Sequence, residues 1–508
     1  MSRSPSKGSI LAPFAGASET HSAVVFFVGD RACKLKKPIR LDFLDFSTVE
    51  ARAAACARET ELNRRFAPDV YLGVAEIRDP AGKVCDHLVL MRRMPASRRL
   101  SALVRAGEPT TNAVRQVARV LAAQHASAAR GPEIGRQGGR DALRLRWHDN
   151  FEQLSKVARD LIDATEINEA ATLADRFLAG REPLFDVRVQ RGRVVDGHGD
   201  LLADDIFCLD DGPRILDCLD FDDHLRWVDG LDDAAFLAMD LEQLGAARLA
   251  EQFIAWYGEF SGDDCPASLC HHYVAYRAIV RAKVGCVRAG QGDPAAAGGA
   301  RKLTSAALRH LRAGVVTLAL VGGLPGTGKS TLAEKLADQL GWVVLSSDRV
   351  RKELAGLEQD QPAAAGFGTG IYAQTWTDRT YAELLNRAGE LLSMGESVIV
   401  DATWSSEAHR QAAAAIAAHR EAELVQLECV TPQEVAATRI AGRAGNASDA
   451  TAAIAACLAA EWSPWSEATV IDTNSVGHAD PVERALNAIR PHGPEHVWRP
   501  SRPYMLPG

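Results

Sequence analysis

The first hundred residues alternate apolar and polar positions with a period of two, which is typical of strands that bury one face. A helical segment, Thr48–Phe66, interrupts this pattern. The predicted strands are Ser22–Val28 and Ala32–Lys36, joined by a turn at residues 29–31, followed by Tyr71–Ile77 and Val84–Arg92. This order predicts an antiparallel sheet in an N-lobe over residues 1–95, preceded by a loosely ordered stretch of about twenty residues rich in Ser, Gly and Pro.

From Leu100 the period becomes helical. One predicted helix, capped near Thr111 or Asn112, has Val114, Val117, Leu121 and His125 on one face. Residues 96–300 therefore form an expected helical lobe, with helices continuing through Phe151–Leu178. We interpret the polar, glycine-containing Arg130–Gly139 as an exposed loop, and the Gly/Pro/Ala-rich Gly290–Ala300 as a linker. Arg301–Arg312 then predicts a helix that leads into a last domain, 311–508.

A phosphate-binding motif opens this last domain. The short apolar run Thr317–Val321 predicts a buried parallel strand, and Ser330–Leu340 has the leucine spacing of a helix. The segment between them fits G-x-x-x-x-G-K-[ST], whose glycines let backbone N–H groups surround a phosphate at a helix N-terminus. Lys329 would reach the β- and γ-phosphates of a nucleotide, and Ser330 would hold Mg²⁺. The expected cradle is Gly323, Leu324, Pro325, Gly326, Thr327, Gly328, Lys329, Ser330 and Thr331.

Carboxylates follow two later strands of the same domain. Asp348 ends the strand Trp342–Leu345, and we expect it to accept a proton from a substrate hydroxyl. Arg351 lies one helical turn later and would hold an anionic group of the substrate. Asp401 ends the strand Ser397–Val400 and suits a Mg²⁺ site.

Further strands are expected at Leu424–Val430 and Thr469–Asp472, and a last helix at Pro481–Ile489. Arg439 and Arg443 follow the first of these strands and are four residues apart. That spacing suits a lid that binds substrate phosphates, and suits a surface charge pair equally well.

The bulk composition is that of a globular protein. The 508 residues are 47% hydrophobic and 24% charged, with a net charge of −8, which argues against a nucleic-acid coat protein or a binder of anionic membranes. No apolar run is long enough to span a bilayer, and no signal peptide is evident. The ten cysteines form no C-x-x-C pair, so we expect reduced thiols in a cytoplasmic protein.

A second acidic stretch lies in residues 194–223. His198-Gly199-Asp200 precedes the strand Ile206–Leu209, and a hairpin turn returns the chain to Asp217. Asp200 and Asp217 thus flank one hairpin, an arrangement that suits Mg²⁺ bound by carboxylate oxygens and a base that faces a hydroxyl. A solvated acidic loop is the alternative.

The sequences HGDLLADDIF and ILDCLDFDD resemble the catalytic loop and metal-binding segment of the aminoglycoside phosphotransferase-like family, small-molecule kinases with a protein-kinase-like fold. The resemblance covers about residues 20–300. It implies that Asp200 is the catalytic base and that Asp217, or otherwise Asp220, binds Mg²⁺. It also implies that Lys34 contacts the nucleotide phosphates and pairs with Glu59. The position of Lys34 alone indicates the alternative, a solvated charge on an edge strand.

One position departs from that family. Five residues after the catalytic Asp the family usually has Asn, and this chain has Asp205. An aspartate still offers an oxygen ligand for Mg²⁺, so Asp205 joins the candidate metal ligands. The added negative charge also leaves open a pseudokinase that binds a nucleotide without transferring phosphate.

The last domain resembles P-loop small-molecule and polynucleotide kinases, including zeta-toxin-like proteins. The whole chain therefore resembles fusions of the two families, with an α+β kinase-like part and an α/β parallel-sheet part. We expect an ATP- and Mg²⁺-dependent phosphotransferase that acts on a hydroxyl of a small molecule. The alternatives are an ATP-binding regulator with a degenerate N-terminal half and, less favoured by the net charge, a polynucleotide kinase.

Overall fold

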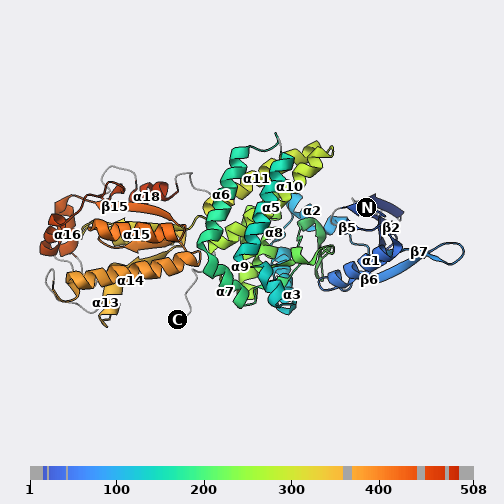
Figure 1. Cartoon of the computed structure of the whole chain (residues 1–508), viewed down its shortest axis with the longest axis horizontal. Helices are drawn as coiled ribbons and strands as arrows, with labels where there is room; N and C mark the ends of the chain where they lie inside the picture. The colour runs from blue at the N-terminus through green and yellow to red at the C-terminus, as the bar shows by residue number, and fades with distance from the viewer. Residues whose placement is uncertain are drawn as a thin grey trace, which may run out of the picture. The chain divides into compact units, whose positions relative to one another are not determined.

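The computed structural model describes residues 15–19, 22–41, 44–158, 160–358, 369–442, 452–474 and 480–490. The chain divides into two compact units (Figure 1), each made of two segments of sequence. The first unit comprises Met1–Gly138 with Gly192–Asp263, and the second Gly139–Arg191 with Asp264–Gly508. No helix among the described residues is long and apolar enough to cross a membrane.

A five-stranded antiparallel sheet in the order β1-β2-β3-β7-β6 begins the first unit, as the alternating pattern predicts. Its helix α1 (Val49–Arg64) starts where the Thr48 side chain accepts a hydrogen bond from Ala51 N. Buried side chains of α1, β3, β6 and β7 form the core beneath the sheet. The strands are β1 (Ala15–Glu19), β2 (Ala23–Val28), β3 (Arg31–Lys36), β6 (Tyr71–Arg78) and β7 (Val84–Arg92), with the short pair β4 (Arg40–Leu41) and β5 (Leu44–Asp45) beside them. Strand β1 corrects part of the expected disorder before residue 20, because it pairs with β2; residues 1–14 lie outside the described chain.

The rest of the first unit is helical, with two small two-stranded antiparallel sheets. The predicted loop over Arg130–Gly139 is wrong, because Pro132–Gln137 forms helix α4. Pro132 presets the first helical turn, and the Cα of Gly138 lies so close to Val194 that an added Cβ would fall 2.3 Å from its side chain. The remaining elements are α2 (Leu100–Arg105), α3 (Thr111–Ser127), β8 (Val194–Asp196), β9 (Ile206–Leu209), β10 (Gly212–Ile215), β11 (Trp227–Asp229), α8 (Gly230–Gln243) and α9 (Ala247–Ser261), with short 3₁₀ turns at Ala96–Arg98, Ala203–Asp205 and Asp223–Leu225.

Five helices form the first part of the second unit. The predicted linker Gly290–Ala300 is wrong, because α11 already begins at Pro294. The Asp293 side chain caps α11, and the sequence of this helix is rich in alanine, a strong helix former. Small side chains let α11 approach α10 closely, since a Cβ at Gly285 would lie 3.2 Å from that of Ala300. The helices are α5 (Arg140–Ala158), α6 (Ala164–Gly180), α7 (Glu182–Gln190), α10 (Ala267–Gly290) and α11 (Pro294–Ala313).

A parallel five-stranded sheet in the order β13-β14-β12-β15-β16 completes the second unit and confirms the expected α/β class. Helices α12 and α18 cover one face, whereas α14 and α15, orange in Figure 1, cover the other. The central strand β12 is buried along its whole length. The strands are β12 (Thr317–Gly322), β13 (Val343–Ser346), β14 (Val398–Asp401), β15 (Glu423–Val430) and β16 (Thr469–Asp472). The helices are α12 (Lys329–Leu340), α13 (Ser347–Leu354), α14 (Gln374–Ser393), α15 (Glu407–His419), α16 (Gln433–Ala441), α17 (Ala452–Ala460) and α18 (Pro481–Ile489), with a 3₁₀ turn at Gly370–Tyr372.

Candidate active sites

The loop between β12 and α12 has the backbone that its glycines predict. Gly323, Gly326 and Gly328 have φ values of 141°, 86° and 86°, a region that side chains disfavour. A Cβ at Gly323 would lie 2.5 Å from Cys429 O, and one at Gly326 would lie 2.6 Å from Ala436 O. Both positions therefore require glycine twice over, for the backbone angle and for the space.

The end of β14 meets the start of α12 at this loop. Asp401 is 5% exposed, and burial raises the pKa of its carboxyl group against the opposing effects of the Lys329 charge and a hydrogen bond from Ser330. Its Oδ1 atom is buried without a hydrogen-bond partner. An unpartnered buried oxygen beside Ser330 is what a hard cation would satisfy. Ser330 and Asp401 thus fit Mg²⁺, although no group of three or more His, Cys, Asp or Glu suited to a metal occurs among the described residues.

Trp404 holds the segment after Asp401 in place, a role that no sequence motif indicates. It is fully buried with a φ of 57°, and its backbone N–H donates to the Tyr381 hydroxyl over 3.0 Å. Its Nε1 donates to Val400 O over 3.1 Å. Burial raises the pKa of Tyr381 to about 12, so this hydroxyl stays protonated at neutral pH. The strand end that carries Asp401 is therefore fixed by packing rather than by a ligand.

A cleft of about 520 Å³ surrounds the loop and includes Lys329, Ser330, Asp348 and Asp401 among its lining residues. Asp348 lies in the first turn of α13, after β13. The cleft thus brings together the predicted phosphate-binding lysine, the predicted base and the predicted metal ligands. Their roles stay predictions.

Arg351 points away from this cleft. Only 8% of it is exposed, and its guanidinium donates to Ile371 O over 2.9 Å and to Thr377 Oγ1 over 3.1 Å. It also lies over the Tyr372 ring, 5.0 Å from the ring centroid. Arg349, which the sequence analysis did not single out, lines the cleft instead. Residues 349 and 351 differ by 200° around a helix, so their opposite directions follow once one face of α13 is known to be buried.

Arg439 lies against the phosphate-binding loop. Its guanidinium donates to Gly326 O over 3.4 Å, to Thr473 Oγ1 over 3.1 Å and to Thr473 O over 3.0 Å. Thr473 in turn donates to Thr327 O over 2.6 Å. Thr473 is a loop contact that the sequence analysis missed, and Arg443 lies outside the described residues.

Five charged side chains form a network in the first unit. Lys34 Nζ lies 2.8 Å from Glu59 Oε1 and 2.9 Å from Asp217 Oδ1. Lys36 Nζ lies 2.8 Å from Glu59 Oε2 and 2.8 Å from Asp220 Oδ2. The expected pairing of Lys34 with Glu59 is present, and Lys36 shares the same carboxylate, which the sequence analysis did not foresee. Asp217 and Asp220, the two alternative metal ligands, are thus each paired with a lysine, so these contacts do not choose between them.

The electrostatics of this network favour the charged forms. Burial alone would lower the pKa of Lys34, but Asp217 and Glu59 outweigh it and hold that pKa well above its usual range. Burial would likewise raise the pKa of Glu59, but the two lysines keep it below its ordinary value. Asp217 is held at a φ of 62°, rare for a residue with a side chain, and donates its backbone N–H to the Tyr71 hydroxyl over 3.2 Å. Strain of this kind concentrates at functional sites.

Asp200 and Asp205 lie near Asp217. Burial is the largest effect that raises the pKa of Asp205 well above its usual range, and the carboxylates of Asp217 and Asp200 add to it. The three carboxylates therefore repel one another in the absence of a cation. These three carboxylates are not among groups of His, Cys, Asp or Glu suited to a metal, because no such group of three or more occurs in the described part of the chain, so Mg²⁺ binding by Asp205 and Asp217 stays a prediction.

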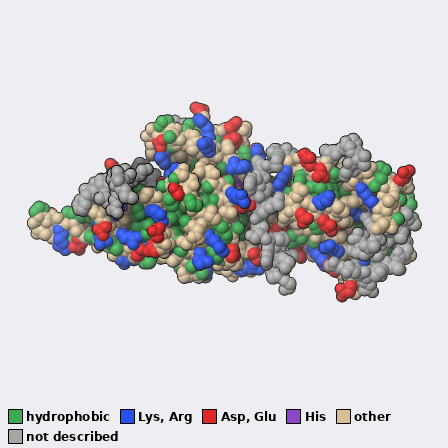
Figure 2. Space-filling model, turned by 180° about the vertical axis from the view of Figure 1, so that it is seen from behind, with side chains coloured by type: hydrophobic (Ala, Val, Ile, Leu, Met, Phe, Trp, Pro, Cys, Tyr) green, Lys and Arg blue, Asp and Glu red, His purple; other side chains and the backbone are tan. Residues whose placement is uncertain are grey.

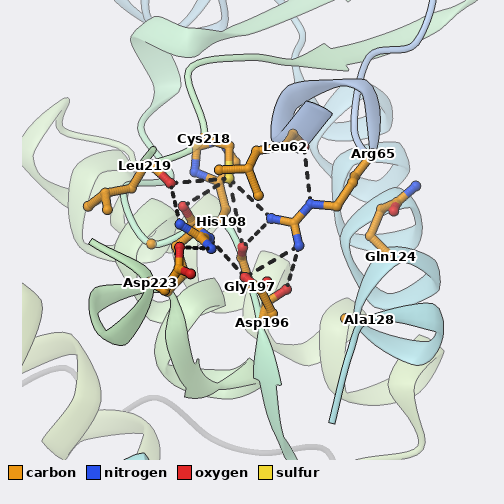
Figure 3. Close-up of polar contacts among 12 residues, drawn as sticks. Leu62, Arg65, Gln124, Ala128, Asp196, Gly197, His198, Cys218, Leu219 and Asp223 are labelled. Carbon is orange, nitrogen blue, oxygen red and sulfur yellow. Dashed lines mark hydrogen bonds and ion pairs between the residues drawn. The ribbon is translucent and has the colours of Figure 1, made fainter. Parts of the chain in front are cut away.

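Buried polar contacts hold the backbone around Asp200. Asp233 accepts hydrogen bonds from His198 N over 2.7 Å and Gly199 N over 2.9 Å, and its Oδ2 lies 3.0 Å from His125 Nε2. Figure 3 shows Arg65, the residue after the end of α1, with its side chain directed toward Asp196 and Gly197. Its guanidinium donates to Asp196 O over 3.1 Å and to Gly197 O over 2.9 Å. The Arg65 guanidinium is also 3.3 Å from Cys218 Sγ, so these contacts hold the residues before Asp200 and the residue after Asp217.

Relatives of known sequence match a part of the chain or nearly all of it. The model of a family described as "AAA domain" matches residues 318–461. The "Uncharacterized protein Rv2004c" of Mycobacterium tuberculosis and the "Uncharacterized protein Mb2027c" of Mycobacterium bovis are each 45% identical over 489 residues, or 96% of this chain and 96% of each relative. The chain belongs to the family of these mycobacterial proteins. The family match at residues 318–461 confirms the P-loop resemblance of the last domain.

Solved structures also show similarity to each part. A choline/ethanolamine kinase family protein from Mesorhizobium loti covers 59% of this chain and 93% of its own, with 17% identity and a TM-score of 0.36. The GDP and kanamycin complex of APH(2")-IIia covers the same shares, with 17% identity and a TM-score of 0.39. The APS kinase of M. tuberculosis, in complex with AMPPNP and APS, covers 34% of this chain and 96% of its own, with 20% identity and a TM-score of 0.26.

The raised pKa of Asp205 predicts a pH-dependent effect of Asp205→Asn. An unfolded aspartate has a pKa of about 3.9, so above that pH the folded chain binds more protons at Asp205 than the unfolded chain does, and stability falls as pH rises toward the folded pKa. The side-chain amide of the Asp205→Asn variant does not ionise, so the variant lacks this loss of stability. In metal-free buffer we expect Asp205→Asn to raise the midpoint of thermal unfolding at pH 7–8, with the gain shrinking as the pH approaches 4.

The matched control for this variant is Asp210→Asn, in the same hairpin. Its side chain is 98% exposed in a surface pair with Arg98, so its removal should leave the midpoint almost unchanged. An Asp205→Asn variant that is less stable than the wild type at every pH would show that the ionised carboxylate has a favourable partner and would contradict the prediction.

Proposed function

We propose that this protein is an ATP-dependent phosphotransferase whose P-loop cleft transfers the γ-phosphoryl group of ATP to a hydroxyl of a small molecule. The observation that carries the proposal is the convergence of Lys329, Ser330, Asp348 and Asp401 in one cleft around a glycine loop. A site that only binds phosphate would need Lys329 and Ser330 but neither carboxylate. A carboxylate on each of two adjacent strand ends adds a candidate metal ligand and a candidate base.

Each side chain has a distinct role in this proposal. The loop N–H groups and Lys329 bind and orient the phosphates, while Arg439 keeps the loop in place through Thr473. Ser330 and Asp401 would hold Mg²⁺, which when bound neutralises charge on the β- and γ-phosphates. Asp348 accepts the proton of the acceptor hydroxyl as its oxygen bonds to the γ-phosphorus, the bond from that phosphorus to the bridging oxygen breaks, and ADP leaves.

The charges of the cleft favour a small acceptor over a nucleic-acid end. On the β13–β14 side the lining holds Asp348 and Asp401, with exposed Arg349 as the cation from α13, and Arg351 is turned away. On the face in Figure 2, basic and acidic side chains are interspersed among the described residues rather than gathered into a basic track. A polyanion would need such a track, so we favour a small-molecule acceptor.

The N-terminal network supports a second nucleotide site. Lys34, fixed by Glu59 and Asp217, would contact the phosphates, and Asp217 with Asp205 would hold Mg²⁺. Asp200 is the base if this site transfers phosphate. The specific observation that favours the alternative, a nucleotide-binding regulatory half, is the extra carboxylate Asp205 close to Asp200 and Asp217.

Lys329→Ala should abolish most turnover of the P-loop cleft. In full-length protein carrying Asp200→Asn, which removes transfer by the N-terminal site, we expect the rate of ADP release from ATP to fall at least tenfold, equivalent to about 1.4 kcal/mol. Lys335→Ala is the control, because Lys335 also lines the cleft but lies on the exposed face of α12. Equal rates in the Lys329 and Lys335 variants would rule out the assigned role.

The two carboxylates of the cleft should be separable by kinetics. With an acceptor identified by screening labelled ATP against sugars, aminoglycosides, nucleosides and RNA ends, Asp348→Asn should lower kcat by roughly 10²–10⁴ while ATP binding persists. Asp401→Asn should instead raise the Mg²⁺ concentration needed for half-maximal rate, measured at saturating ATP. If only Asp348→Asn shifts the Mg²⁺ requirement, the two roles are reversed.

A further inference from the structure

A small cavity in the second unit lies at the opposite end of the parallel sheet from the phosphate-binding loop. Its volume is about 20 Å³. It is bounded by α6, the α6–α7 junction, α10 and the residues that lead from α11 into β12. The polar lining includes Arg181, His272, Ser268 and Arg176, and the apolar lining includes Phe177 and Leu311.

Arg181 brings a buried positive charge to this cavity. It is 1% exposed and forms no ion pair with a carboxylate of the described chain. One guanidinium nitrogen donates to Arg420 O over 2.5 Å, whereas Nε is buried without a partner. Burial is the main effect that lowers the pKa of Arg181 to about 9, and the charges of Arg176 and Arg420 add to it while Glu421 opposes it. A guanidinium with this pKa remains charged at pH 7, and a buried charge without a counterion is costly.

His272 brings a second unused donor. Burial and then the charge of Arg181 lower its pKa to about 3, so the ring is neutral at pH 7. Its Nε2 accepts a hydrogen bond from Trp147 Nε1 over 3.0 Å. The proton of a neutral ring must then be on Nδ1, and this buried Nδ1 has no partner. The ring is held by stacking on Phe177, with centroids 4.4 Å apart.

The other charged groups around the cavity leave it positive. Arg176 is paired with Glu423 over 3.1 Å, and its Nε donates to Glu421 O over 3.1 Å. Glu421 is the acidic residue of the lining, and its side chain is exposed to water rather than paired with Arg181. Both unpartnered buried nitrogens of this lining, Arg181 Nε and His272 Nδ1, are donors.

We propose that this cavity binds a small monovalent anion, such as chloride, through Arg181 Nε–H and His272 Nδ1–H. A volume of about 20 Å³ exceeds the ~10–15 Å³ that one water needs, so a halide fits and a carboxylate-bearing or larger anion does not. The anion neutralises Arg181 where the α6–α7 junction meets the segment 314–316 that leads into β12. It therefore stabilises the attachment of the central strand, independently of nucleotide.

Thermal unfolding of the full chain in chloride and in gluconate tests the proposal. At constant ionic strength, replacing gluconate by 100 mM chloride should raise the unfolding midpoint of the wild type by about 2–4 °C, because a ligand that binds only the folded state stabilises it. Arg181→Met should abolish this difference, whatever its own stability. Arg387→Met, which removes an equal charge from partly exposed ion pairs with Glu353 and Glu383, should keep it.

A second measurement covers the case in which Arg181→Met fails to fold. Crystals of the wild type grown or soaked in bromide should show an anomalous peak between Arg181 Nε and His272 Nδ1. Equal midpoints in chloride and gluconate, the same chloride effect in Arg181→Met as in the wild type, or an ordered water without anomalous signal at this position would each overturn the proposal.

Discussion

The absence of a Cβ at Gly326 is the constraint on which the C-terminal site depends. The loop carries Lys329 and Ser330 into the cleft only because it bends through positive φ at residues where a neighbouring carbonyl, Ala436 O, lies too close for any side chain. That carbonyl belongs to α16, and Arg439 on the same helix donates to Gly326 O and to Thr473. Contacts with Ala436 and Arg439 thus hold the loop in its conformation without a bound phosphate. Such preorganisation reduces the ordering cost of binding.

The N-terminal site is organised by charge rather than by backbone shape. One buried carboxylate, Glu59, lies 2.8 Å from each of two lysines, and these lysines reach Asp217 and Asp220. Removing a charge from water is costly unless the charge is paired in this way. Asp205 is the exception, because its neighbours are other carboxylates and its pKa rises. The two sites therefore differ in what a ligand would have to satisfy. In the P-loop cleft, the Asp401 Oδ1 atom is buried without a hydrogen-bond partner. In the N-terminal site, the carboxylates around Asp205 repel one another.

The sequence predicted those features that depend on local pattern. The strands of both sheets follow from alternation and from apolar runs, and the glycine loop follows from its motif. What it missed depends on tertiary contacts. The direction of Arg351 is set by Ile371 and Thr377, far along the chain, and Lys36 shares Glu59 only because β3 and α1 pack together. Gly290–Ala300 reads as a linker by composition, yet its small residues are what let α11 pack on α10.

Calorimetric titration of the full-length protein with Mg²⁺ and AMPPNP tests the central claim most directly, using two glycine variants. Gly326 and Gly341 both have positive φ, but a Cβ at Gly341 would meet no atom within 4 Å. We predict that Gly341→Ala binds the analogue as the wild type does, whereas Gly326→Ala has one binding event fewer. Unchanged stoichiometry and affinity in Gly326→Ala would contradict the assignment of this loop as a nucleotide site.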